Sequence, residues 1–199
     1  MAFLVGITGG ICAGKSTVLQ QLEGLRQHVL DSDRIVHRLY NPGTPVTEAL
    51  HARYGSIVAN RSHGVNRQLL ADRVFNSVTE LQWLNHLIHP FVKREIHHVQ
   101  ARLDGILFCA VPLLFEVKWD SFMDCTASVW CDHPTQMARI AHRGWNSGEL
   151  HRRQTVQLPM EEKLERADYG VINNSTIEIL QLQLNKLLKR IARKFGISE

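Results

Sequence analysis

Residues 6–17 of the chain read GITGGICAGKST, and this stretch decides the fold. Within it, residues 9–16 match the pattern G-x-x-x-x-G-K-[ST] at every fixed position. The apolar run 3–8 predicts a strand before the match, and the helical spacing of apolar residues over 16–27 predicts a helix after it. Because a strand, a glycine-rich loop and a helix in this order form a phosphate-binding loop, the sequence predicts binding of a nucleoside triphosphate.

The residue types of loop 9–16 explain how such a loop holds phosphate. Backbone N–H groups and the positive end of the following helix together stabilise several negative charges. Glycine at positions 9 and 14 allows backbone angles and a close approach that a Cβ would obstruct. Lys15 can reach the β- and γ-phosphates, and the hydroxyl of Ser16 can ligate Mg²⁺. The expected ATP contacts are Gly10, Ile11, Cys12, Ala13, Gly14, Lys15, Ser16 and Thr17.

Four further apolar runs, at 27–30, 106–111, 127–131 and 169–172, predict the other strands. Strands that alternate with helices predict an α/β fold. We expect a three-layer α/β/α sandwich with a five-stranded parallel sheet, of the P-loop nucleoside triphosphate hydrolase type. Helices are expected at residues 35–40, 45–54, 67–75, 80–103, 135–143, 148–157 and 176–195.

The length of 199 residues bounds the number of domains. A chain of this size buries roughly 70% of its unfolded surface around one core, so we expect a single domain spanning 1–199. A helical insert at about 35–103 and a lid at about 135–157 would extend from the core sheet. The lid segment is rich in arginine, and glycines at 144 and 148 separate its two helical parts, which suits closure over a substrate.

Composition and charge argue against several other classes of protein. No apolar run approaches the roughly 20 residues of a membrane-spanning helix, and the first residues lack a secretory leader, so we expect a cytoplasmic protein. Four cysteines without CxxC pairing argue against disulfides, and eleven histidines without a compact ligand set argue against zinc. The net charge of +4 is modest, and the basic run 186–194 is typical of an amphipathic helix, so no nucleic-acid partner is expected.

Two aspartates bear on how the triphosphate would be used. Asp31 and Asp33 follow the second predicted strand, and neighbouring parallel strands end at the sheet edge where loop 9–16 lies. One of the two carboxylates could therefore accept the proton of a hydroxyl that attacks the γ-phosphate. The alternative is that both aspartates cap the helix that follows them. Asp31 would either contact Mg²⁺ through water or only support the loop.

The absence of certain motifs from the sequence argues against two classes of P-loop protein. It contains no N-K-x-D stretch and no convincing D-x-x-G switch, which argues against a GTPase. No predicted strand ends in an obvious Walker B aspartate, which argues against a motor ATPase. A small-molecule kinase remains, and its transferred phosphoryl group needs positive charge nearby. Candidates in the lid segment are Arg139, Arg143, Arg152 and Arg153, each of which could instead be a solvated helix residue.

Several motifs, taken together, resemble the dephospho-CoA kinase family of P-loop enzymes. They span nearly the whole chain, and the last four are much more specific than the phosphate-binding loop. Another small nucleoside or nucleotide kinase of the same fold is the nearest alternative. In order, the motifs are TGGICAGKST (8–17), LDSD (30–33), the Pro42-Gly43 turn, LIHP (87–90), VPLLFE (111–116) and QLPMEEKLERADYGVINN (157–174).

The resemblance implies a reaction and its participants. ATP would phosphorylate the ribose 3′-hydroxyl of 3′-dephospho-coenzyme A, giving coenzyme A and ADP in the final step of coenzyme A biosynthesis. Mg²⁺ would accompany ATP, and neither a membrane nor an obligate protein partner is implied. Asp33 matches the family's catalytic base, and Lys15 would stabilise the transition state. Arg139 matches the lid arginine, with Arg143 one helical turn further on.

Further binding residues follow from the same resemblance. The helical insert would bind the acceptor, and Asn173 and Asn174 resemble the family's adenine-side turn. The family's loop commonly reads G-G-I-G-S-G-K-S, so Cys12 and Ala13 depart from it, and the backbone angles at position 12 must suit a residue with a Cβ. The lid tip at 144–147 departs as well. Acceptor contacts are implied for Asp33, His89, Arg94, Leu114 and Glu116.

Overall fold

The computed structural model describes residues 1–144 and 155–197. The chain divides into two compact units, one formed by Met1–Leu30 with Gln100–Glu199 and the other by Asp31–Val99. The first unit contains the sheet and loop 9–16, and the second is mainly helical.

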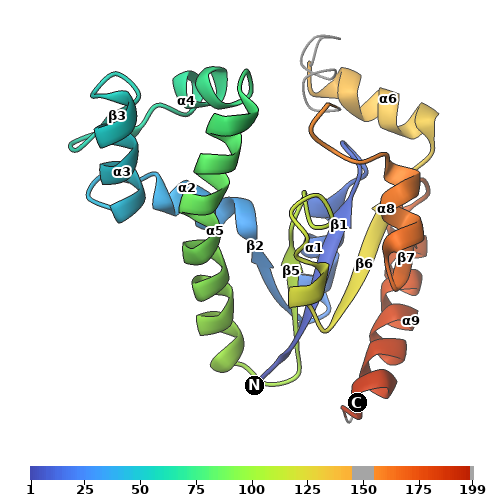
Figure 1. Cartoon of the computed structure of the whole chain (residues 1–199). Coiled ribbons are helices and arrows are strands. Elements are labelled where there is room, and N and C mark those ends of the chain that lie inside the picture. Colours follow the sequence, from blue (N-terminus) through green and yellow to red (C-terminus); the bar gives the residue numbers. More distant parts are fainter. Residues whose placement is uncertain (145–154, 198–199) are drawn as a thin grey trace. The chain divides into compact units, whose positions relative to one another are not determined.

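The first unit is built on a five-stranded sheet in the order β2-β5-β1-β6-β7 (Figure 1). β1 pairs in parallel with both β5 and β6, and β6 pairs in parallel with β7. This sheet confirms the predicted α/β fold class. Its strands are β1 (Phe3–Gly9), β2 (His28–Asp31), β5 (Ile106–Ala110), β6 (Cys125–Trp130) and β7 (Tyr169–Ile172).

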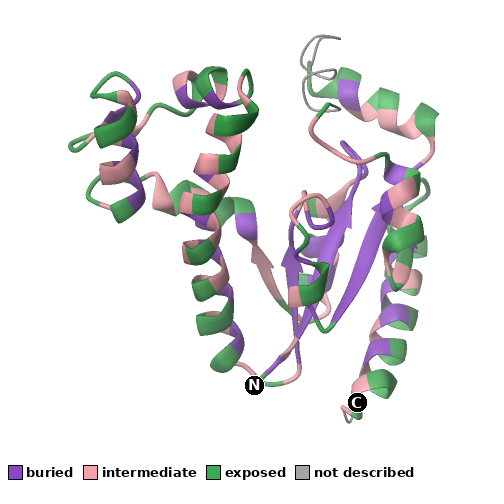
Figure 2. Cartoon of the chain, viewed as in Figure 1, coloured by how far each residue is buried: buried purple, intermediate pink, exposed green. Residues whose placement is uncertain are grey.

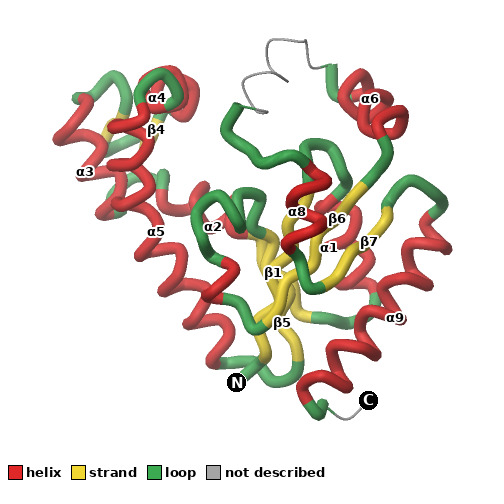
Figure 3. The backbone as a smooth tube through the Cα atoms, turned by 45° about the vertical axis from the view of Figure 1, so that its right-hand side comes forward, coloured by secondary structure: helices red, strands yellow, loops and turns green. Residues whose placement is uncertain are grey.

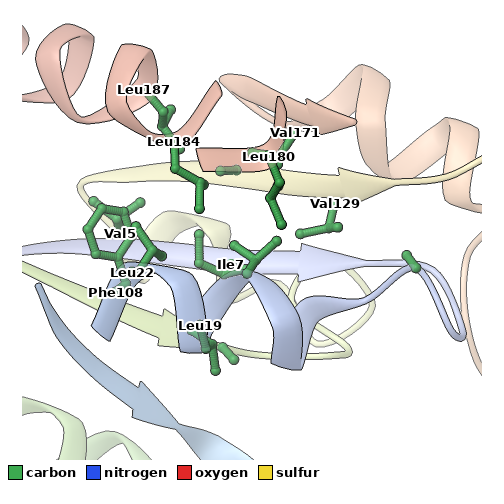
Figure 4. Packing of buried hydrophobic residues seen from close by; sticks show 14 of the residues in the cluster. Val5, Ile7, Leu19, Leu22, Phe108, Val129, Val171, Leu180, Leu184 and Leu187 are labelled. Carbon is green, nitrogen blue, oxygen red and sulfur yellow. The ribbon is translucent and has the colours of Figure 1, made fainter. Parts of the chain in front are cut away.

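Helices cover both faces of this sheet, which explains why its central strands are buried along their length (Figure 2). On one face, α1 (Lys15–Gly24) and α9 (Ile177–Phe195) enclose a core that includes Ile7, Leu22 and Leu180 (Figure 4). On the other face lies α8 (Met160–Arg166), seen in front of the sheet in Figure 3. Adjacent residues of β7 show the two layers: Val171 joins the α1 and α9 core, whereas Gly170 faces Leu164 of α8.

Some helices begin or end at residues other than those that the sequence predicts. α1 ends at Gly24, short of the predicted residue 27, because Arg26 adopts a left-handed conformation with φ 60°. The Gln27 N–H then bonds the Leu22 carbonyl at 3.0 Å, which closes the helix as a Schellman motif. In the lid segment, α6 spans His133–His142. Outside that segment, the sequence did not predict η1 (Asp120–Phe122) or α8. Most of the predicted helix 148–157 lies outside the described residues.

The second unit contains four helices and a small hairpin. Side chains of Asp31, Thr44 and Asn66 cap α2, α3 and α4 by accepting a backbone N–H of the first turn. The hairpin has strands of two residues, too short for a periodic sequence signal. The elements are α2 (Ser32–Leu39), α3 (Pro45–Tyr54), β3 (Ala59–Asn60), β4 (Gly64–Val65), α4 (Arg67–Val74) and α5 (Val78–Ala101), which continues into the first unit.

A charged and aromatic cluster holds α3 against α5 within the second unit. Arg53 donates to both oxygens of Glu80 at 2.7 and 2.8 Å, and Tyr54 also donates to Glu80. The Arg53 guanidinium lies 4.3 Å from the centre of the Trp83 ring, in cation–π contact. The Arg53 hydrogen bonds are the main cause that lowers the pKa of Glu80 to about 2.

No helix in residues 1–144 or 155–197 is long and apolar enough to cross a membrane.

Candidate active site

The phosphate-binding loop connects β1 to α1, as the sequence predicts, and its backbone is unusual at three positions. Gly9 and Gly14 have φ values of 148° and 96°. A Cβ on Gly14 would lie 2.1 Å from Asn173 Nδ2, so glycine is required there. Cys12 has φ 56°, in the left-handed region that costs a residue with a Cβ roughly 1–2 kcal/mol. The loop therefore tolerates Cys12 at a cost that its neighbours must offset.

Arg139 of α6 binds the outside of this loop. Its Nη1 donates to the carbonyl oxygens of Ala13 at 3.0 Å and Cys12 at 3.4 Å. Its Nη2 donates to the carbonyl of Asn173 at 2.8 Å, and the Asn173 side chain donates to Ala13 at 2.9 Å. Two side chains thus hold the carbonyls of the loop from one side.

Gln136, one turn before Arg139 on the same face of α6, adds a third contact. Its Nε2 donates to the Ile11 carbonyl at 2.7 Å, and Ile140 packs with Ile11 and Cys12 in a small buried cluster. In a trans peptide the C=O and the next N–H point in opposite directions. Holding the carbonyls of Ile11 and Ala13 from outside therefore turns the N–H groups of the two residues that follow them away from α6, as phosphate binding requires.

Lys15 and Ser16 begin α1 beside this loop. Lys15 Nζ donates to the carbonyls of Gly9 at 2.8 Å and Gly10 at 3.2 Å, so its charge lies across the loop. The Ser16 side chain is exposed. Among the described residues, no side chain caps the first turn of α1, and its backbone N–H groups can serve a bound anion.

Asn174 and Arg143 lie near the same elements but have other contacts. Asn174 Nδ2 donates to Asp132 Oδ2 at 3.1 Å, and Asp132 caps α6 by accepting the Thr135 N–H. Hydrogen bonds from Thr135, followed by that from Asn174, lower the pKa of Asp132. Arg143 is exposed at the end of α6. Arg152 and Arg153 lie outside the described residues.

The segment after β5 brings Glu116 to a buried lysine. Glu116 Oε1 lies 2.8 Å from Lys163 Nζ of α8 and accepts the Leu158 N–H at 2.8 Å. Among the described residues, Glu116 Oε2 is buried without a hydrogen-bond donor. Burial lowers the pKa of Lys163, against the opposing effect of Glu116. Leu114 is fully buried and faces Gly6, as a core residue does.

Asp31 and Asp33 begin α2 in the second unit. Asp31 Oδ1 accepts the Asp33 N–H at 2.9 Å, so Asp31 is the cap of this helix, as the alternative interpretation of the sequence proposed for it. The Asp33 side chain is exposed and lines a pocket of about 160 Å³ within this unit. The two aspartates therefore have different surroundings despite their proximity in sequence.

The pocket at Asp33 has a polar and an apolar part. Arg67 Nη1 lies 3.0 Å from His37 Nε2, which must act as the acceptor because a guanidinium only donates. Burial raises the pKa of Tyr40 to about 12, so its hydroxyl stays protonated. The apolar lining is Val36, Leu70, Ala71, Val74, Phe75 and Leu84.

The other predicted acceptor residues lie on α5. His89 is half-buried, and burial, followed by the charges of Lys93 and His86, lowers its pKa. Arg94 is exposed, with its guanidinium 5.1 Å from the centre of the Phe91 ring. Neither residue is among those that line the pocket at Asp33.

Some site residues escape the sequence analysis. Gln136 could be found from its spacing of three residues to Arg139 on a predicted helix. Lys163 stands in the charged run EEKLER, where nothing local marks this lysine as buried. His37, Tyr40 and Arg67 come together only through the packing of α2 and α4.

Comparison with known proteins identifies the family. The dephospho-CoA kinase family model matches residues 3–178, which include the loop, both aspartates and Lys163. The chain belongs to the dephospho-CoA kinase family. A dephospho-CoA kinase of Symbiobacterium thermophilum is 36% identical, over 91% of this chain and 78% of that protein. One from Halalkalibacterium halodurans is 32% identical, over 94% of this chain and 96% of that protein.

A solved structure supports the fold assignment. Thermus thermophilus TT1252 superimposes with a TM-score of 0.84 at 30% identity, covering 95% of this chain and 97% of that one. Similarity along nearly the whole length means that the family assignment does not depend on loop 9–16 alone.

Proposed function

We propose that this chain transfers the γ-phosphoryl group of ATP to the ribose 3′-hydroxyl of 3′-dephospho-CoA. The main support for ATP binding is the set of hydrogen bonds that Gln136 and Arg139 donate to the loop carbonyls. These bonds direct the N–H groups of Cys12 and Gly14 away from α6, where they can donate hydrogen bonds to a phosphate chain. Membership of the dephospho-CoA kinase family supports the acceptor.

Asp33 is the proposed general base. The 3′-oxygen attacks Pγ and forms the new O–P bond, the bond from Pγ to the ADP oxygen breaks, and the hydroxyl proton passes to the Asp33 carboxylate. The side chain of Asp33 is exposed and lines a pocket, which is consistent with access to a substrate hydroxyl. The pocket is too small for a whole coenzyme, and its apolar lining and Arg67 suit one part of the acceptor.

Cations near loop 9–16 would stabilise the transferred group. We assign this role to Lys15, which would exchange its bonds to the Gly9 and Gly10 carbonyls for phosphate oxygens. Arg139 would add positive charge from the α6 side of the loop while it holds the carbonyls, and its direct contact with ATP remains a prediction. Arg143, Asn173 and Asn174 remain predicted ATP contacts.

The proposed acceptor contacts beyond Asp33 have unequal support. Glu116 Oε2 has no donor among the described residues and could accept one from the substrate. His89 and Arg94 remain predicted contacts from the helical unit. Leu114 is fully buried, so it could reach a ligand only through a backbone group.

Mg²⁺ is the proposed companion of ATP. The exposed Ser16 hydroxyl offers the oxygen that this cation prefers, and Asp31 is the proposed contact through water. When bound, Mg²⁺ would neutralise charge on the β- and γ-phosphate oxygens. Within residues 1–144 and 155–197, no three His, Cys, Asp or Glu side chains form a metal-binding group.

A coupled assay of ADP release tests the proposed function. The purified chain would be given ATP and, separately, dephospho-CoA, adenosine, AMP, CMP or dTMP. We expect turnover with dephospho-CoA and a product that carries one added phosphate at the 3′ position by mass and ³¹P spectra. Turnover confined to a nucleoside monophosphate would reject the acceptor, and ADP release insensitive to every acceptor would indicate a nucleotide-dependent switch instead.

A further inference from the structure

A fully buried lysine joins two segments of the first unit. Lys163 Nζ lies 2.8 Å from Glu116 Oε1 and donates to the Pro112 carbonyl at 2.6 Å. Its side chain has no exposed surface, and that of Glu116 is 14% exposed. Burying both charges is costly, and apolar residues of similar volume often stabilise a fold as well as a buried pair does. A contribution to fold stability is therefore a weak explanation for the presence of this buried ion pair.

The pair connects directly to the strand that leads into loop 9–16. The Pro112 carbonyl also accepts from the Thr8 hydroxyl at 3.3 Å, and Thr8 lies on β1 immediately before the loop. Glu116 Oε1 in turn accepts the Leu158 N–H. One cluster thus ties together the end of β1, the segment after β5 and the segment that enters α8.

Met160 extends this connection to the loop itself. It lies one helical turn before Lys163 on α8, so the two side chains share a face of the helix. A Cβ on Gly10 would lie 2.8 Å from Met160 Cβ, and Met160 Sδ accepts the Cys131 N–H at 3.4 Å. Fixing Lys163 therefore fixes how Met160 covers the loop.

We infer that Glu116 and Lys163 are positioning residues, which hold residues 157–163 and the segment after β5 in the arrangement that shapes loop 9–16 for ATP. The inference rests on the proposed ATP binding by that loop. It assigns Lys163 no contact with either substrate.

Two variants of the full chain separate positioning from stability. Lys163→Met removes the directed bonds of the ammonium and leaves Glu116 buried without its partner. The double variant Glu116→Gln, Lys163→Met also removes those bonds but leaves no unpaired charge, so it should regain most of the stability that the single variant loses. Each would be measured for urea midpoint, for ATP Kd by equilibrium dialysis, and for the KM of each substrate.

Both variants should bind ATP roughly 10- to 100-fold more weakly, the scale of a small misplacement at a site. For Lys163→Met, which keeps the Glu116 side chain, the KM for dephospho-CoA should change less than about threefold. A double variant that regains ATP affinity together with stability would overturn the inference, because the pair would then be merely structural. Should Lys163→Met fail to fold, the double variant alone decides by the same criterion.

The control is Arg166→Met, which removes a cation from the same helix. Arg166 pairs with Glu162 at the surface, so its loss should change the ATP Kd by less than about twofold. An effect as large as that of Lys163→Met would overturn the inference. Lys15→Ala, measured in parallel, should lose ATP binding. Unchanged binding there would reject the proposed ATP site, whereas tight binding by the Lys163 variants alone would reject only the positioning role.

Discussion

The left-handed backbone at Cys12 gives a sharp test of the loop geometry. Cys12→Ala and Cys12→Gly both remove the thiol from its contacts with Ile11 and Ile140, so comparing these two variants cancels that loss. They differ in whether a Cβ remains at φ 56°. A left-handed residue with a Cβ costs about 1–2 kcal/mol, and the extra chain entropy of glycine costs about 0.5–1 kcal/mol.

The midpoints of these two ranges predict that Cys12→Gly unfolds with a free energy about 0.75 kcal/mol higher than that of Cys12→Ala. With a urea m-value of about 2 kcal/mol/M, the unfolding midpoint would move by roughly 0.4 M. Ala13→Gly provides the control in the same loop, because Ala13 is outside the left-handed region and its change to glycine should destabilise the fold. A Cys12→Gly variant no more stable than Cys12→Ala would refute the assigned backbone conformation.

Two further predictions concern charged side chains. Arg139→Met should lower the free energy of unfolding by about 2–3 kcal/mol in urea titrations, since it removes two well-formed charge-assisted hydrogen bonds to backbone carbonyls; a loss no larger than that of Arg166→Met would contradict this reasoning. Glu80 has a lowered pKa, so the stability it adds should be complete above pH 4.5 and be lost as the pH falls through about 2. Urea unfolding of the parent chain and Glu80→Gln from pH 2 to 6 measures this, and a difference that vanishes already at pH 4 would be inconsistent with the Arg53 contact.

Local signals in the sequence were sufficient for most of the fold. Glycine positions and apolar runs are local signals, because each can be recognised within a short stretch of sequence. They were enough to predict the strand, loop and helix around residues 9–16 and the buried strands at 106–111 and 127–131. The strand order could not be predicted, because it depends on pairing between distant segments. The early end of α1 at Gly24 depends on a left-handed Arg26, which no sequence rule favours.

In the candidate site, too, local motifs could be predicted from the sequence, whereas contacts between distant segments could not. Lys15 and Ser16 are fixed by the motif, but the contacts of Arg139 are with backbone carbonyls, which carry no sequence signature. Lys163 looks like an ordinary surface residue until Glu116, far away in the sequence, is seen beside it. The sequence therefore indicated candidate residues for the site, but it could not show which groups those residues contact.

Asp33→Asn in a single-turnover experiment tests the central claim most directly. The variant would be saturated with ATP and mixed with dephospho-CoA, and the formation of 3′-phosphorylated product would be followed by rapid quench. Asp72→Asn, an exposed aspartate on α4, is the matched control. With Asp33 as the base, the rate of transfer should fall on the order of 10²-fold or more, while ATP affinity stays nearly unchanged. A transfer rate equal to that of the control would contradict the account.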